Sequence, residues 1–205
     1  EYLTVVQPQC AAAVMNWHTG ELVAIVGGRS TPVQKLQLKR AYQMKMSVGS
    51  SLKPLAVYGP ALDLGASPAS PVLNLPIPIE GWNGGEGYPR NFSTDGDYTG
   101  VESMRYAINR SHNTSTAHVL YEYVGIENAV KYLLMAAAFG AVANSGAYQE
   151  PYAFTQILNP DGTVYIDVRE VQTTREVFKP STAWMLVDML KGCVQEGVGT
   201  GARAN

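Results

Sequence analysis

Ser50 and Lys53, three positions apart in the run VGSSLKP (residues 48–54), are the residues of this sequence best suited to do chemistry. On a helix, positions i and i+3 face nearly the same side, so the Lys53 amine would point toward the Ser50 hydroxyl. A serine hydroxyl becomes a good nucleophile when a neighbouring base takes its proton. A partly desolvated lysine can be that base, because burial lowers its pKa. The pair therefore predicts nucleophilic catalysis, and Gly49 would let the backbone approach a substrate closely.

Taken alone, a Ser-x-x-Lys spacing also describes a helix N-cap followed by a solvated lysine. A second element changes this balance: Ser111-His112-Asn113 is a Ser-x-Asn triplet inside a stretch with a helix-like pattern. Ser-x-x-Lys followed by Ser-x-Asn is the ordered signature of serine acyl-transfer enzymes that act on penicillin and on cell-wall peptides. We predict that four residues form one catalytic set: Ser50, Lys53, Ser111 and Asn113.

With these motifs, the chain resembles the transpeptidase domain of penicillin-binding proteins, and most of all the bifunctional class A type that builds peptidoglycan. The resemblance extends along almost the whole chain. Residues 11–28 resemble the opening hairpin of that family, residues 88–92 (YPRNF) match its Tyr-x-x-Asn-aromatic element, and residues 144–146 match its Ala-Asn-x-Gly stretch. The fold that this implies is α+β, the penicillin-recognising serine enzyme fold, in which an antiparallel sheet is packed by helices and joined to an all-helical lobe.

The third motif of the family, Lys-Thr/Ser-Gly, does not occur in these 205 residues. Residues 199–205 resemble the segment just upstream of that motif. The expectation is therefore one transpeptidase domain over residues 1–205, incomplete at its C-terminal end. Within it we expect sheet-forming parts at 1–30 and 150–170 and a helical lobe at about 50–145.

The resemblance implies a role for each member of the catalytic set. Ser50 would attack the carbonyl of the penultimate D-alanine of a peptidoglycan stem peptide, and an amine of a neighbouring stem would resolve the acyl-enzyme into a cross-link. Lys53 would be the general base, Ser111 a proton relay, and Asn113 a ligand of both the substrate amide and Lys53. The same chemistry implies acylation by β-lactams. His112, at the middle of the triplet, is interpreted as structural.

Two other kinds of function stay open at this point. A D,D-carboxypeptidase or a β-lactamase would pass the acyl group to water instead of an amine. No acidic residue is recognisable at the position of the deacylating glutamate of class A β-lactamases, which favours slow deacylation. A non-catalytic domain would bind cell-wall peptide or β-lactam as a scaffold or sensor, and the missing third motif is compatible with that function.

The composition indicates an ordered globular protein, with 46% hydrophobic and 16% charged residues. A formal charge of −2 without a Lys/Arg cluster argues against a nucleic-acid partner. The longest apolar run, residues 132–143, is shorter than the ~18 residues needed to cross a bilayer. The family resemblance implies an upstream membrane anchor and a place on the extracytoplasmic face of the bacterial membrane. Whether a glycosyltransferase domain precedes the chain stays open.

No metal site or cofactor is predicted. His18 and His118 lack a partner at ligand spacing. The pair Gly27-Gly28 does not continue into a phosphate-binding pattern. Cys10 and Cys193 are expected to be buried free thiols.

Two hairpins and four helical regions are predicted to carry these residues. Short apolar runs rich in β-forming residues, joined by turn residues, predict hairpins over residues 11–26, with both strands covered, and over residues 152–168. Apolar residues at helical spacing predict the helices, and residues 66–92, rich in Pro, Gly and Asn, are predicted to form a long ordered loop near the site. The predicted helical regions are residues 50–64, residues 101–124 as two helices that meet at the Ser-x-Asn triplet, residues 126–144, and residues 180–193.

Overall fold

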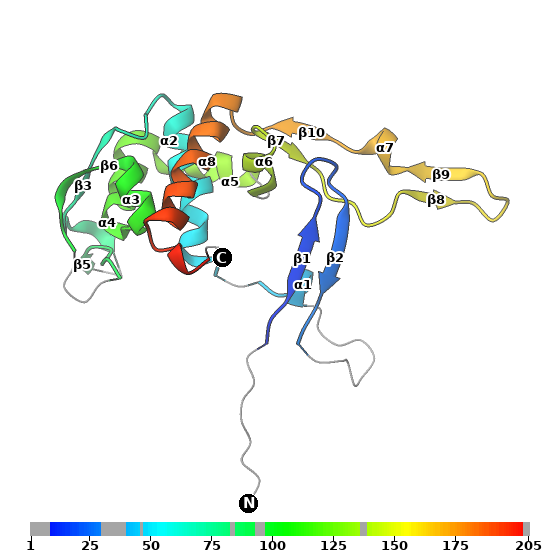
Figure 1. The fold of residues 1–205 in the computed structure, drawn as a ribbon, viewed down its shortest axis with the longest axis horizontal. Helices are drawn as coiled ribbons and strands as arrows, with labels where there is room; N and C mark the ends of the chain where they lie inside the picture. The colour runs from blue at the N-terminus through cyan, green and yellow to red at the C-terminus, as the bar shows by residue number, and fades with distance from the viewer. Residues whose placement is uncertain are drawn as a thin grey trace, which may run out of the picture. The chain divides into compact units, whose positions relative to one another are not determined.

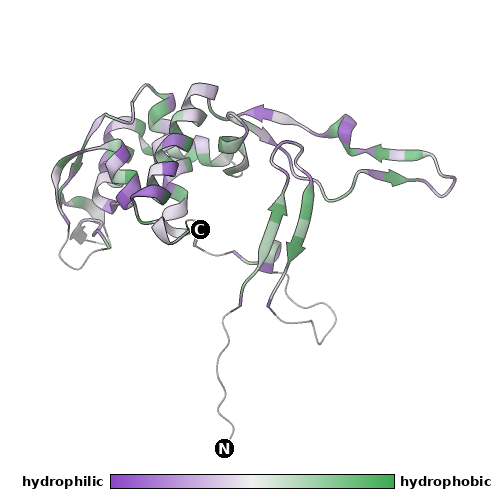
Figure 2. Ribbon diagram, viewed as in Figure 1, coloured by the Kyte–Doolittle hydropathy of each residue, from purple (hydrophilic) through white to green (hydrophobic). Residues whose placement is uncertain are grey.

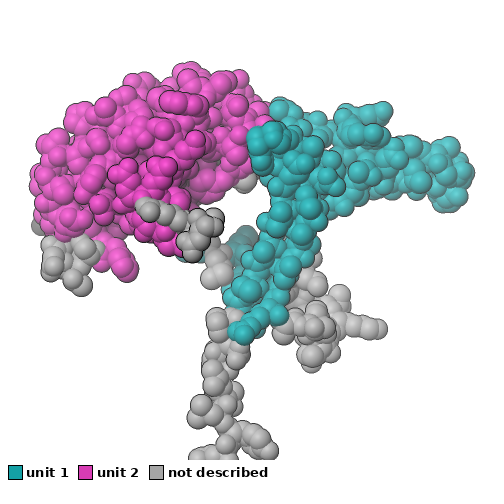
Figure 3. All heavy atoms as spheres, in the orientation of Figure 1, with its two compact units in different colours: residues 1–47, 149–174 teal, residues 48–148, 175–205 magenta. Residues whose placement is uncertain are grey.

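The chain divides into two compact units, each built from two segments (Figure 3). Unit 1 comprises residues 1–47 and 149–174, and unit 2 comprises residues 48–148 and 175–205. The computed structural model describes the following residues: 9–29, 40–45, 47–82, 85–92, 97–135 and 139–202.

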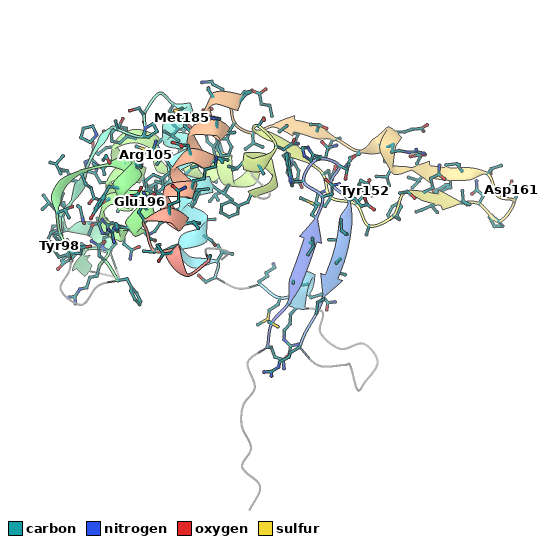
Figure 4. The ribbon with its side chains drawn as sticks, viewed as in Figure 1. Tyr98, Arg105, Tyr152, Asp161, Met185 and Glu196 are labelled. Carbon is teal, nitrogen blue, oxygen red and sulfur yellow. The ribbon has the colours of Figure 1, made fainter. Side chains whose placement is uncertain are left out.

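Unit 1 contains the two predicted hairpins, both antiparallel. In the first, β1 (Ala12–Met15) pairs with β2 (Leu22–Val26). In the second, β8 (Gln156–Leu158) pairs with β9 (Val164–Asp167), and Asp161 lies at its tip (Figure 4). Figure 2 shows that β1 and β2 are hydrophobic along much of their length.

Two short helices complete the described part of unit 1: α1 (Arg40–Gln43) and α7 (Val168–Val171). The carboxylate of Asp167 accepts a hydrogen bond from the Arg169 backbone N–H at 3.0 Å and so caps α7. The division between the units runs through β7 (Ala147–Gln149) and β10 (Thr174–Glu176), which pair with each other.

A continuous helical segment from Gly49 to Asp63 forms the centre of unit 2. It begins as a 3₁₀ turn, η1 (Gly49–Leu52), continues as a π-helix, η2 (Pro54–Tyr58), and ends as α2 (Gly59–Asp63). Residues 54–62 are all buried. The predicted extent of this helix is confirmed, but its start is not α-helical.

The helical segment runs through Pro60, although proline in a helix interior removes a backbone hydrogen bond and often kinks or ends the helix. The helix continues to Asp63 because the π-helical turn ahead of Pro60 is wider than an α-helical one. The Gly59 N–H donates to the carbonyl of Pro54, five residues back. This register leaves room for the Pro60 ring, which in a regular α-helix would meet a carbonyl of the preceding turn.

The core of unit 2 forms around this central segment. Helix α8 (Pro180–Gln195) packs against α2 and α3 (Met104–Arg110), and α5 (Ile126–Met135) packs against η2 (Figure 1). An ion pair at 2.6 Å joins Arg105 on α3, labelled in Figure 4, to Asp188 on α8. The largest apolar side chains with almost no exposure are Tyr58, Val72, Met104, Val119, Phe178, Leu186 and Met189.

The prediction of an irregular loop over residues 66–92 is wrong, because this stretch contains strands. β3 (Pro71–Asn74) pairs antiparallel with β6 (Gly100–Ser103), and β4 (Ile79–Trp82) pairs with β5 (Gly85–Gly87). Burial alternates along β3, where Val72 and Asn74 face inward. Because the inward position 74 holds a polar Asn, the sequence lacks the alternation of apolar and polar residues that would have predicted this strand.

The remaining helices follow β6 in chain order. α3 leads through the Ser-x-Asn triplet into α4 (Asn113–Val119), so the predicted junction of two helices at the triplet is confirmed. The predicted start of the first helix is wrong, because residues 101–103 belong to β6. Within the described residues, no helix combines the length and the apolar character that a membrane span requires. The other elements are η3 (Leu120–Val124), α6 (Phe139–Ala143) and η4 (Thr200–Ala202).

Candidate active site

The turn that carries Ser50 and Lys53 is a 3₁₀ turn closed by its own backbone, where the Lys53 N–H donates to the carbonyl oxygen of Ser50. In a 3₁₀ helix, side chains at i and i+3 eclipse one another, so these two side chains leave the backbone on the same face. Gly49, directly before Ser50, has a φ of 57°. Only glycine adopts this left-handed conformation without strain, which explains its place ahead of the nucleophile.

The Lys53 amine meets three oxygen acceptors from the Ser-x-Asn triplet. Its Nζ lies 2.7 Å from the backbone carbonyl oxygen of Ser111, 3.2 Å from the Ser111 Oγ and 2.5 Å from the Asn113 Oδ1. None of these acceptors is charged. Burial lowers the pKa of Lys53 from 10.5 to about 8. At pH 7 about one molecule in ten would then hold a neutral amine that can accept a proton.

Ser50 itself is exposed, and within the described residues its hydroxyl has no hydrogen-bond partner. The neighbouring Ser51 differs, because its Oγ donates to the carbonyl of Val48 at 2.6 Å. Of the two adjacent hydroxyls, only that of Ser50 is without a partner among the described residues, where the hydrogen bonds of the Lys53 amine go to Ser111 and Asn113.

The backbone at the triplet turns sharply between the two helices. Ser111 ends α3 in a left-handed conformation, with φ 55° and ψ 37°, and His112 is extended. A left-handed conformation costs a residue other than glycine about 1 kcal/mol or more, so the surrounding contacts must hold it. This turn presents the carbonyl and hydroxyl of Ser111, together with the side chain of Asn113, to Lys53.

Asn91 and Arg90 fix the orientation of Asn113. The backbone N–H of Asn113 donates to the Asn91 Oδ1 at 2.7 Å, and its Nδ2 donates to the carbonyl of Arg90 at 2.6 Å. Because Nδ2 is engaged in this way, the Oδ1 of Asn113 is the atom that faces Lys53. The Asn91 side chain also accepts from the Thr114 N–H at 3.2 Å. It therefore caps α4, whose own N-cap residue, His112, makes no side-chain cap.

Comparison with known families agrees with the motifs. The sequence profile described as "Penicillin binding protein transpeptidase domain" matches residues 124–205. Penicillin-binding protein 1A of Clostridium acetobutylicum is 31% identical over 234 aligned residues, which cover 98% of this chain and 28% of the relative. Penicillin-binding protein 1A of Clostridium perfringens strain 13 is 29% identical and covers 95% of the chain. The chain belongs to the penicillin-binding protein transpeptidase family.

Solved structures show the same fold. The crystal structure of penicillin-binding protein 1A from Haemophilus influenzae matches with a TM-score of 0.76 and 21% identity, covering 93% of this chain and 36% of that one. The D,D-transpeptidase domain of a peptidoglycan glycosyltransferase from Eggerthella lenta matches with a TM-score of 0.67 and 18% identity, covering 95% and 63%. This penicillin-binding protein chain has the α+β, penicillin-recognising serine enzyme fold. It spans about 28% of the length of the Clostridium acetobutylicum relative.

Three residues of the predicted catalytic set meet through hydrogen bonds in this penicillin-binding protein chain, namely Lys53, Ser111 and Asn113, and Ser50 shares a turn with the first of them. Their chemical roles stay predictions. Asn91 was left out of the set although it lies in the Tyr-x-x-Asn-aromatic element. The Asn of this element is the sequence feature from which a role of Asn91 beside the triplet could have been predicted.

The other site expectations concern metals and thiols. Among the described residues, no group of His, Cys, Asp and Glu side chains is arranged to hold a metal ion. Both cysteines are free, but Cys10 is exposed and Cys193 only half-buried, so the expectation of two buried thiols is wrong. Neither thiol belongs to the predicted catalytic set.

Proposed function

We propose that this chain is a serine D,D-transpeptidase domain that cross-links peptidoglycan stem peptides through an acyl-enzyme on Ser50. The observation that carries the proposal is the Lys53 amine, held by Ser111 and Asn113, on the same 3₁₀ turn as the exposed Ser50. A nucleophile, a base with a lowered pKa and a second hydroxyl within reach of that base are what acyl transfer to serine requires.

In the acylation step, neutral Lys53 takes the proton of the Ser50 hydroxyl while Oγ forms a bond to the carbonyl carbon of the penultimate D-alanine. The Ser50 N–H lies in the first turn of its helix, where backbone donors lack an intrahelical acceptor, and is free to stabilise the oxyanion. The peptide C–N bond then breaks. The terminal D-alanine leaves with a proton that passes from Lys53 through the Ser111 hydroxyl, 3.2 Å away.

In the second step, the amine of a neighbouring stem peptide attacks the Ser50 ester. Its proton returns through Ser111 to Lys53, the Oγ of Ser50 is expelled and takes a proton, and a new amide joins the two stems. Lys53 passes this proton to the Ser50 Oγ and becomes a neutral amine again, so both residues end in the state in which they began.

β-Lactams would acylate Ser50 by the same attack on their strained amide. The leaving nitrogen then stays tethered to the acyl group. Among the described residues, no carboxylate is hydrogen-bonded to Ser50, Lys53, Ser111 or Asn113. These contacts therefore hold no carboxylate like the deacylating glutamate of class A β-lactamases, which favours slow hydrolysis of the acyl-enzyme.

The proposal extends to the setting of the whole protein. Peptidoglycan and its stem peptides lie outside the cytoplasm, so the domain would act on the extracytoplasmic face of the bacterial membrane, tethered by an anchor upstream of residue 1. A glycosyltransferase domain on the same polypeptide would supply the glycan strands whose stems are joined.

The test is labelling of the protein with fluorescent penicillin, followed over time. Durable labelling that disappears in Ser50→Ala and persists in Ser51→Ala supports the proposal, and peptide mass spectrometry should place the adduct on Ser50. Ser51 is the matched control. It is the adjacent exposed serine, and its hydroxyl already donates a hydrogen bond to the backbone carbonyl of Val48. Rapid release of the label would indicate a hydrolase, and binding without a covalent adduct would indicate a sensor or scaffold.

A further inference from the structure

His112 lies between two carboxylates on the side of the triplet away from Lys53. Its Nδ1 is 2.9 Å from the Oε1 of Glu102, and its Nε2 is 3.1 Å from the Oδ2 of Asp97. The side chains of His112 and Glu102 are each 4% exposed, and that of Asp97 is 49% exposed. We call these three residues the His112 cluster.

The geometry of the cluster favours a doubly protonated ring. Besides His112, Glu102 accepts hydrogen bonds from the hydroxyls of Thr99 at 2.5 Å and Ser115 at 2.7 Å, as an ionised carboxylate does. An ionised carboxylate can only accept. Because Glu102 faces one ring nitrogen and Asp97 the other, a hydrogen on each nitrogen would satisfy both carboxylates, and we infer that the ring is an imidazolium.

The charges around the ring agree with this assignment. Burial opposes the charged form of His112, but the hydrogen bonds and negative charges of Glu102 and Asp97 outweigh it and raise the pKa of the ring above 6.5. Among the described residues, two uncharged groups also face the ring: the Nδ2 of Asn74, 3.1 Å from Nδ1, and the ring of Tyr106, with centroids 6.0 Å apart. The Asn74 Nδ2 has other acceptors for its hydrogens, the carbonyl of Asp97 at 2.7 Å and the Thr99 hydroxyl at 3.1 Å.

The backbone of His112 connects the cluster to the site. Its N–H donates to the carbonyl of Ala107 at 3.1 Å, and its carbonyl accepts from the Thr116 hydroxyl at 2.6 Å. The two residues on either side, Ser111 and Asn113, supply all three acceptors of the Lys53 amine. A ring fixed to Glu102 therefore fixes the left-handed Ser111 and the start of α4 at the same time.

We propose that His112 is a positioning residue whose positive charge, bound to Glu102 and Asp97, holds the Ser111–Asn113 turn against Lys53, so that acylation of Ser50 weakens when the ring becomes neutral. The inference deepens the proposed function and rests on it. His112 touches neither Ser50 nor Lys53, and it acts through the turn that it anchors. His112 would thus have more than the structural role expected from the sequence, because its charge would make the reaction depend on pH.

The test compares the wild-type protein with Glu102→Gln. The amide keeps the shape and still accepts from Ser115, but it removes the negative charge that favours the imidazolium. The rate constant of acylation by fluorescent penicillin is measured from pH 5.5 to 8, separately from the affinity of the preceding non-covalent complex. We expect rates within about threefold of each other at pH 5.5, where both rings are protonated, and a wild-type advantage that grows to about tenfold above pH 6.5, where the variant ring becomes neutral first.

Two further variants separate charge from folding. Glu102→Asp keeps the negative charge and should retain the pH profile of the wild type, even with a lower melting temperature. His118→Gln is the matched control on the same helix, because the Nδ1 of His118 has no hydrogen-bond partner among the described residues. It should also retain the wild-type profile. If Glu102→Gln fails to fold, the pH profiles of the acylation rate are compared between Glu102→Asp, which keeps the negative charge at its position, and Asp97→Asn, which removes one beside the ring. The wild-type profile should then be lost only in Asp97→Asn.

The state of the ring is read directly by NMR of protein labelled at its three histidines. The ring of wild-type His112 should titrate above pH 6.5 and above the ring of Glu102→Gln, and a wild-type ring that titrates at or below pH 6.5 would overturn the inference. If the ratio of the acylation rate constants of wild type and Glu102→Gln is the same at every pH, this inference is overturned and the proposed function still stands. Absence of labelling of the wild type at every pH would instead overturn the proposed function.

Discussion

The amine of Lys53 donates a hydrogen bond to the backbone carbonyl of Ser111 at 2.7 Å, and so joins the 3₁₀ turn of Ser50 to a left-handed residue at the end of another helix. A backbone acceptor is present whatever side chain stands at position 111. The position of Lys53 and the proton relay through the Ser111 hydroxyl can therefore be separated by mutation.

Ser111→Ala should leave Lys53 in place and remove only the relay. We expect acylation by penicillin to slow by about a hundredfold or more, the range of a lost general acid–base contact. The affinity of the non-covalent complex should change little. Ser111→Gly, which also lacks the hydroxyl but favours the left-handed backbone, should be equally slow and at least as stable. A Gly variant with wild-type speed would contradict the relay.

Lys53→Arg should keep a cation at the triplet and lose the base. A guanidinium does not release its proton in proteins, so we expect acylation to fall by about 10²–10⁴-fold at every pH between 6 and 9. Stopped-flow or gel-based labelling measures this directly. Lys191→Arg, on the exposed side of α8, is the control and should label as the wild type does.

The acid side of the pH profile should report the lowered pKa of Lys53. The neutral amine is the active form, so the acylation rate should rise about tenfold per pH unit below pH 7 and bend near pH 8, in line with the pKa of about 8 that burial gives Lys53. A bend near the ordinary lysine value of 10.5 would show that the amine is solvated in solution.

The pair formed by Glu102 and His112 should stabilise the fold within a defined pH window. The pKa of His112 is raised above 6.5, so its contribution is complete below pH 6.5 and is lost as the pH rises through the higher value in the folded state. The pKa of Glu102 is lowered from 4.5 despite its burial, chiefly by its hydrogen bond to His112, so its contribution is complete above pH 4.5 and is lost on acidification. The difference in unfolding free energy between wild type and Glu102→Gln, from denaturant titrations, should peak between pH 4.5 and 6.5. A flat difference would contradict the ion pair.

Asn91→Ala should destabilise the protein and slow acylation together. The change leaves the N–H groups of Asn113 and Thr114 without their acceptor, at a cost of about 1–3 kcal/mol. Chemical denaturation measures the first effect and penicillin labelling the second. Asn128→Ala, which removes an amide contact at the start of α5, is the control and should lose stability without a matching loss of labelling rate.

The sequence predicted the helix junction at Ser111–Asn113 because apolar residues at helical spacing flank a polar triplet. It did not predict the 3₁₀ geometry at Ser50, since a spacing of three residues fits both kinds of helix. It missed β3 because Asn74 occupies an inward position. The hydrogen bonds of Asn74, Asn91 and Glu102 to α4 join residues 13 to 40 positions apart. Such contacts leave no local pattern, and only the folded chain brings them together.

The four candidate residues all belong to unit 2, and the contacts that orient them are made within it. The hydrogen bonds that join Lys53 to Ser111 and Asn113 are thus internal to one unit. A substitution confined to the hairpins of unit 1 leaves every one of these donors and acceptors in the sequence unchanged.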